Sequence, residues 1–149
     1  MRSLYHSLIY PYLIYCNLCW GNTYQVHLEP LEILQKKAIR VINGLRFRAH
    51  TREYFHSSKL LKLSDINSYR QAQYVYLNPS QFNTTSHNYD TRNSSQLVPE
   101  FNRTNVTQNS LTYSAPNLWN YLPDDIREAQ SIAEFKSKMF NYLLSKYIN

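Results

Sequence analysis

A length of 149 residues suits one domain and is short for a complete multi-step enzyme, and a hydrophobic share of 43% with 14 tyrosines and 6 phenylalanines excludes a disordered chain. The net charge of +6 is concentrated, because eight lysines and arginines stand against one glutamate between Lys36 and Lys62. Such a block favours a polyanion partner, usually phosphate, although a solvated helix face followed by a loop would show the same pattern.

The first twenty residues predict an apolar helix rather than a secretion signal or a membrane span. Residues 4–16 are nearly all apolar or aromatic, and Pro11 predicts a kink. His6, Pro11 and Asn17 interrupt the run, and no small-residue cleavage site follows, so we expect an intracellular protein that is neither secreted nor in contact with a membrane. Gly21 suits the left-handed conformation that ends a helix. A helix that is apolar nearly all round needs other protein around it.

Cys16 and Cys19 form a C-x-x-C pair, which has the spacing of a metal or redox site. A structural zinc ion needs four ligands, and the sequence offers neither a second cysteine pair nor paired histidines. No predicted strand precedes the pair, as a redox motif would require. We therefore expect two buried thiols and no metal or cofactor.

A second helix is predicted from Pro30 to the helix-ending pair Asn43-Gly44. Its expected buried stripe consists of Leu31, Leu34, Ala38, Val41 and Ile42. Three cations lie toward its C-terminal end, where they suit the helix dipole: Lys36, Lys37 and Arg40. The helix thus presents the start of the basic block on a rigid support.

Cations and aromatic rings are interleaved from Leu45 to His56. In a groove for single-stranded nucleic acid, cations meet phosphates and rings stack on bases. The alternative is that Phe47, Tyr54 and Phe55 pack inward on a short helix that starts near Thr51. With the cations of the preceding helix, the candidate nucleic-acid-binding residues are Lys36, Lys37, Arg40, Arg46, Arg48 and Arg52.

Ser64 can cap a third helix, which Asn78-Pro79 would end. Its expected stripe is Ile66, Tyr69, Gln73, Tyr74 and Leu77. From residue 79 to residue 109 the sequence is rich in Asn, Ser, Thr and Gln, so we expect a loop with at most short extended pieces around 88–92, 96–98 and 111–113. A loop of that length is either functional or mobile.

The stretch 110–147 predicts the anchor of the fold. Leu118, Trp119 and Leu122 are spaced for one core between Pro116 and Pro123, and we expect Trp119 at its centre because an indole offers the largest contact area.

A last helix should follow this core. Ser131 and Glu134 fit a capping box that begins it. Its expected packing face consists of Ile132, Phe135, Met139, Tyr142, Leu143 and Ile148.

The sequence Tyr121-Leu122-Pro123-Asp124-Asp125 looks like the aromatic-x-Asp-Asp of a polymerase palm, where paired carboxylates hold magnesium ions. That motif lies on a β-hairpin. Here Pro123 instead fits the start of a helical turn, whose positive dipole end favours the two aspartates. Two glycines in the whole chain leave no phosphate-cradling loop, and the histidines are scattered, so we predict no catalytic residues.

Four blocks resemble the segment after the polymerase palm in LINE-type (non-LTR, jockey-like) retrotransposon reverse transcriptases. They are 4–21, 31–42, His87-Asn88-Tyr89-Asp90-Thr91-Arg92 and the closing stretch with Leu118-Trp119-Asn120 and Leu122-Pro123. The resemblance covers almost the whole chain. It implies a helical thumb and a C-terminal extension that grip RNA and DNA template and primer beside an upstream palm, which uses magnesium for RNA-directed DNA synthesis.

The resemblance also limits the expected activity. The palm carboxylates lie outside these blocks, so a non-catalytic fragment is implied. Around Tyr76 to Phe82 the chain is shorter than is usual in the family, which raises the alternative of a decayed element whose product has no activity.

Together these patterns predict a mainly α fold, a small helical bundle with a long polar loop and at most short β pieces. The predicted regions are a thumb-like helical part at 1–77, a polar linker at 78–109 and a C-terminal helical module at 110–149 that packs on the first. The predicted function is nucleic-acid gripping. The alternative is a helical protein-interaction or structural module that docks on a partner, in the family case the palm.

Overall fold

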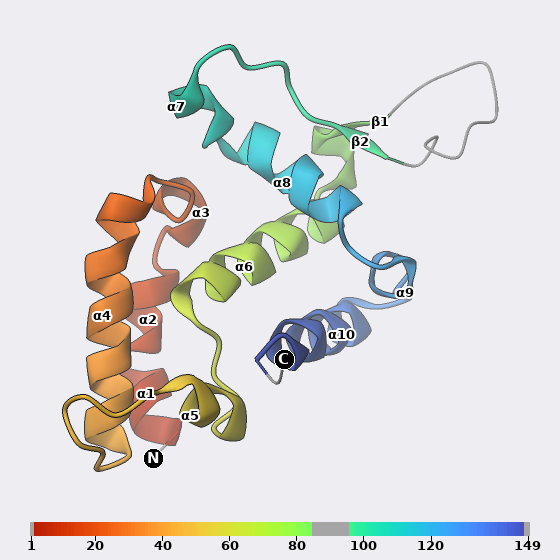
Figure 1. The fold of residues 1–149 in the computed structure, drawn as a ribbon. Coiled ribbons are helices and arrows are strands. Elements are labelled where there is room, and N and C mark those ends of the chain that lie inside the picture. The colour runs from red at the N-terminus through yellow and green to blue at the C-terminus, as the bar shows by residue number, and fades with distance from the viewer. Residues whose placement is uncertain (1, 85–95, 148–149) are drawn as a thin grey trace. The chain divides into compact units, whose positions relative to one another are not determined.

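The computed structural model describes residues 2–84 and 96–147 and confirms the mainly α prediction (Figure 1). The α-helices are α1 (Arg2–Leu8), α2 (Tyr10–Ile14), α3 (Asn17–Trp20), α4 (Gln25–Ile42), α5 (Arg52–Ser57), α6 (Leu63–Leu77), α7 (Asn105–Gln108), α8 (Leu111–Asn120), α9 (Asp124–Arg127) and α10 (Ile132–Ser145). A short 3₁₀ turn, η1 (Pro79–Gln81), precedes the two strands β1 (Asn83–Thr84) and β2 (Leu97–Val98).

The chain forms two compact units. Unit 1 comprises Met1–Asn67 and Phe140–Asn149, and unit 2 comprises Ser68–Met139. Both boundaries fall inside helices, one in α6 and one in α10. The predicted division at residues 77 and 109 stays a prediction.

Unit 1 begins with three short helices, so the prediction of one helix is wrong, although the helix is interrupted at Ile9, close to Pro11, where the kink was predicted. Pro11 lies in the first turn of α2, where its missing N–H costs nothing. Cys16 has a φ of 47°, a left-handed conformation that a helix interior cannot contain, and it separates α2 from α3. Tyr5 and Leu13 are buried, whereas Tyr12 is 79% exposed. The segment therefore packs on one side only.

The helix α4 begins five residues before the predicted start, with Pro30 inside it. Its end at Asn43-Gly44 is confirmed, and Gly44 has the positive φ of 63° that glycine tolerates.

The predicted buried stripe of α4 is wrong for two of its five residues, and the other three are half-buried. Leu34 is 57% and Val41 80% exposed, and the buried residues are Leu28, Gln35 and Ile39. The apolar periodicity pointed to a neighbouring face, on which Leu31, Ala38 and Ile42 are half-buried, because an amide occupies the core position.

Gln35 explains this orientation. Its Nε2 donates to the Tyr5 hydroxyl at 2.7 Å and to the Leu61 carbonyl at 2.9 Å, while its Oε1 accepts from the Leu63 N–H at 3.0 Å. A buried amide costs little when its donors and acceptor are used. One side chain of α4 thus holds α1 and the start of α6.

The helix α6 begins at Leu63, so Ser64 lies within its first turn rather than at its cap, and it ends before Asn78-Pro79 as predicted. Ahead of it, Gly21 has a φ of −66°, and the predicted left-handed conformation is wrong. The Asn67 amide donates to the Gly21 carbonyl at 2.9 Å, and a Cβ on Gly21 would lie 2.5 Å from Asn67 Oδ1. Glycine is needed at position 21 because the Asn67 side chain approaches its backbone too closely for a Cβ atom.

In unit 2, β1 and β2 form a short antiparallel pair with Asn83 opposite Val98. This confirms the predicted extended piece at 96–98. The piece expected at 111–113 is wrong, because these residues open α8, and the piece at 88–92 lies outside the described residues. The Asn120 side chain holds α8 to β2 by donating to the Leu97 carbonyl at 2.8 Å and accepting from the Leu97 N–H at 3.0 Å.

Phe135, rather than Trp119, is the central ring of unit 2. Phe135 is fully buried and stacks on Tyr76 at 4.5 Å and on Trp119 at 5.9 Å between ring centroids. Trp119 is only partly buried and packs against the cluster of Val75, Leu97 and Ala115. The indole is at the edge because Ala115 and Pro116 occupy the buried face of α8.

The capping box of α10 is confirmed with a shift of one position. Ser131 Oγ accepts from the Glu134 N–H at 3.2 Å, and the Glu134 carboxylate accepts from the Gln130 N–H at 3.0 Å, one residue before the cap. On the helix itself, three predicted packing residues are buried: Phe135, Met139 and Leu143. Ile148 lies outside the described residues.

Candidate nucleic-acid interface

The paired aspartates Asp124 and Asp125 lie at the start of a short helix, as predicted. Pro123 is the N-cap of α9, and both aspartates lie in its first turn. Asp125 accepts from Lys138 Nζ at 2.7 Å, and Asp124 pairs with Arg127. Hydrogen bonds to Asp125 and Glu134 raise the pKa of Lys138. Across residues 2–84 and 96–147, no three His, Cys, Asp or Glu side chains gather in a way that could hold a metal ion.

The two thiols are exposed, so the prediction of buried cysteines is wrong. The left-handed turn at Cys16 directs Asn17 inward, and Asn17 is 1% exposed.

The loop after α4 carries the exposed part of the basic block. Arg46, Phe47 and Arg48 are all exposed, and Phe47 is 75% exposed. Arg40 Nε donates to the Ala49 carbonyl at 2.9 Å, which ties the loop to the end of the helix. The ring and its flanking guanidinium groups are therefore presented to solvent from an anchored loop.

The alternative, in which Phe47, Tyr54 and Phe55 pack inward, is correct for only some of these rings. A short helix does start after Thr51, and Phe55 is fully buried on it. Tyr54 is half-buried, and Phe47 points away from the core. Tyr54 and Phe55 lie on α5, whereas Phe47 lies on the loop before it. The sequence alone did not show which rings pack inward and which are exposed.

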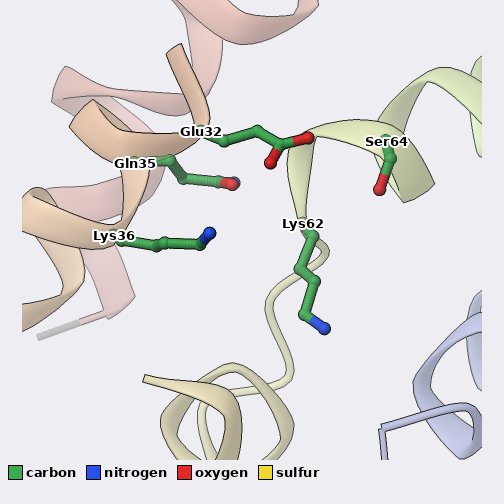
Figure 2. A pocket seen from close by; sticks show the side chains of 5 residues that line it. All are labelled: Glu32, Gln35, Lys36, Lys62 and Ser64. Atoms are coloured by element: carbon green, nitrogen blue, oxygen red, sulfur yellow. The ribbon is translucent and has the colours of Figure 1, made fainter. Parts of the chain in front are cut away.

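Lys36 lines a pocket of about 190 Å³ in unit 1 (Figure 2). The other lining residues are Glu32, Gln35, Lys62 and Ser64. In Figure 2 the two lysines extend from α4 and from the segment before α6, and the Glu32 carboxylate points toward the start of α6. The two ammonium groups outnumber the one carboxylate, so the pocket has a positive charge.

Lys62 is the functional candidate that sequence reasoning missed. It lies within the basic block but 26 positions after Lys36, and only the fold brings the two to one pocket. Its Nζ lies 4.5 Å from the ring centroid of Tyr147, a cation–π distance.

Arg52 reaches the same tyrosine. Its Nε donates to the Tyr147 carbonyl at 3.1 Å, while the Tyr147 hydroxyl accepts from the Lys62 N–H at 2.9 Å and donates to Asp65. Burial, and then the hydrogen bond to Asp65, raise the pKa of Tyr147. Tyr147 therefore stays a neutral donor and links Arg52 to Lys62.

Lys37 lies in a different hollow from Lys36, because consecutive helical residues project about 100° apart. It lines a shallow groove of about 460 Å³ with Val26, Glu29, Pro30, Ile33 and Leu34.

All six predicted cations thus belong to unit 1 but occupy separate places. Arg40 lies in the last turn of α4, and Arg46 and Arg48 lie on the loop that it anchors. Lys36 shares a pocket with Lys62, Arg52 is hydrogen-bonded to Tyr147, and Lys37 lies in the groove. Their contact with nucleic acid stays a prediction.

No described helix has the length and apolar character needed to cross a membrane. Comparisons with protein-family models, curated proteins and solved structures found no match to this chain.

Proposed function

We propose that this chain is a non-catalytic, intracellular nucleic-acid-binding fragment of a retrotransposon RNA-directed DNA polymerase, gripping RNA and DNA beside a polymerase palm. The resemblance of four sequence blocks supports the family, with the block at 87–92 outside the described residues. One observation carries the binding function: two exposed arginines flank an exposed phenylalanine on the loop after α4.

The chemistry of this loop fits a single strand. Arg46 and Arg48 would contact backbone phosphates, and Phe47 would stack on a base, which contributes about 1–3 kcal/mol. Because guanidinium groups donate in a planar fork, they match phosphate oxygens well. Lys36 and Lys62 offer a second phosphate contact in their pocket.

The test is binding of a fluorescent single-stranded RNA, a DNA strand and a hybrid duplex, measured by anisotropy. The double variant Arg46→Ala/Arg48→Ala should bind roughly tenfold more weakly in low salt, without a change in sequence preference. Arg103→Ala is the matched control, because Arg103 is an exposed arginine of unit 2. Equal losses in both variants would contradict the proposed loop.

A protein-interaction module is the alternative, and an exposed apolar surface favours it. On the first two helices and the residue after them, the exposed large apolar side chains are Leu4, Leu8, Tyr12 and Tyr15. Apolar side chains gathered on a few turns mark docking sites. Aggregation of the isolated chain that a purified polymerase palm relieves, without any RNA or DNA binding, would support this alternative. A product of a decayed element would neither bind nucleic acid nor dock on a palm.

A further inference from the structure

The helix α4 has a second apolar face that is largely exposed. Val26 is 68% and Ile33 43% exposed, and Leu34 and Val41 are exposed as well. At about 100° per residue, these side chains project opposite the buried Leu28, Gln35 and Ile39. They line or extend the shallow groove that contains Lys37. One face of α4 packs inside unit 1, and the second, apolar face is therefore available for a partner.

The charges along α4 show which partner fits. Glu29 and Glu32 lie in its first half, and the cations Lys36, Lys37 and Arg40 lie in its second half. Glu29 and Lys37 both line the groove, each four residues from Ile33, and neither forms an ion pair within residues 2–84 and 96–147. The charge pattern of α4 is therefore complementary to that of a second α4 helix that runs in the opposite direction.

We propose that a second copy of this chain docks on this groove, with the two α4 helices antiparallel about a twofold axis near Ile33. Glu29 of each copy then faces Lys37 of the other, and the apolar side chains of the groove meet between them. The two helix dipoles also oppose each other favourably. A parallel pair would instead bring Lys37 against Lys37, so only the antiparallel arrangement satisfies the charges.

The twofold arrangement limits the assembly to a dimer. The same patch is used by both copies, so the contact is closed and cannot propagate into a filament. One pair of 18-residue helices spans about 27 Å and buries less than about 1,200 Å² in total, which places the dimer among weak, reversible contacts. Dissociation is therefore expected in the micromolar range.

This inference does not depend on nucleic-acid binding. The dimer uses Glu29, Ile33 and Lys37, whereas the exposed arginines of the loop after α4 lie outside the groove. Lys37 would be occupied by the second copy rather than by phosphate.

Sedimentation equilibrium of the full chain, over about 1 to 500 µM, tests the proposal. The natural chain should show a monomer–dimer equilibrium. Glu29→Lys and Lys37→Glu should each weaken it by roughly tenfold, because each places like charges together twice in the dimer. The double variant Glu29→Lys/Lys37→Glu should restore dimerisation, since both pairs are simply exchanged.

The matched controls are Glu100→Lys and Lys136→Glu, which make the same charge changes at exposed positions of unit 2 and should leave the equilibrium unchanged. Circular dichroism checks that each variant is folded. A monomer throughout the concentration range, a double variant no better than the single ones, or assemblies larger than a dimer would each overturn the proposal. If the groove instead binds a partner of another kind, the chain should stay monomeric throughout the concentration range.

Discussion

Gln35 is the residue on which the packing of unit 1 depends most clearly. Its amide serves two donor bonds and one acceptor bond to Tyr5, Leu61 and Leu63 while it is 2% exposed. Replacing it by leucine keeps the volume but leaves those three groups buried without this partner.

We expect Gln35→Leu to lower the free energy of unfolding by about 2–4 kcal/mol, measured by urea denaturation. Gln25→Leu is the control, because Gln25 is exposed on the same helix and should change stability by about 0.5 kcal/mol or less. Equal effects of the two substitutions would show that the hydrogen bonds of Gln35 do not hold the core.

Tyr147 gives a prediction for alkaline pH. Its pKa in the folded chain is raised above the ordinary value of 10.0, first by burial and then by the hydrogen bond to Asp65. Because the folded pKa exceeds the unfolded one, the phenol's contribution to stability is complete below about pH 10 and is lost as the pH rises further.

The measurement is urea denaturation of the natural chain and of Tyr147→Phe between about pH 8 and pH 11. The natural chain should be the more stable of the two at pH 8, and the difference should shrink above about pH 10. A difference that is constant over this range would contradict the protonated, buried phenol.

At the scale of single elements, the anchored loop after α4 is the structure that makes Phe47 available. We expect Phe47→Ala to weaken single-stranded RNA binding by about 1–3 kcal/mol and to leave duplex binding nearly unchanged, because paired bases cannot stack on the ring. Phe101→Ala is the control, since Phe101 is an exposed phenylalanine of unit 2. Anisotropy titrations with both ligands check this, and a loss of equal size for the duplex would exclude base stacking.

Four ends of elements could be predicted from sequence because local chemistry sets them. Gly44 stops α4, Asn78-Pro79 stops α6, Pro123 opens α9, and Ser131 caps α10. Each of these signals acts within one turn of the backbone, so no tertiary partner is needed to interpret it.

The buried face of α4 could not be predicted in the same way, although that of α10 could. Val41 and Leu34 looked like core residues of α4, yet Gln35 takes the core position because Tyr5, Leu61 and Leu63 supply its partners from elsewhere in the chain. The same holds for the candidate interface. Lys62 joins Lys36 only through tertiary packing, which the spacing along the sequence does not encode.

At the scale of the whole molecule, the net positive charge belongs to unit 1. The carboxylates that resembled a palm motif lie in the first turn of α9 and form ion pairs within unit 2. Nucleic-acid binding by unit 1 is the function that we propose for this chain. In our proposals, two surfaces of unit 1 have different partners: the loop after α4 binds nucleic acid, and the groove of α4 binds a second copy.

The salt dependence of single-stranded RNA binding shows whether the loop after α4 contacts phosphates. For a single strand, log K should fall linearly with log salt concentration, with a slope of about −0.7 for each neutralised phosphate. Over about 50 to 200 mM salt, we expect a steep slope for the natural chain and a slope smaller by about 1.4 for Arg46→Ala/Arg48→Ala, with Arg103→Ala unchanged. Binding that does not respond to salt, or a double variant with the natural slope, would contradict phosphate contact by this loop.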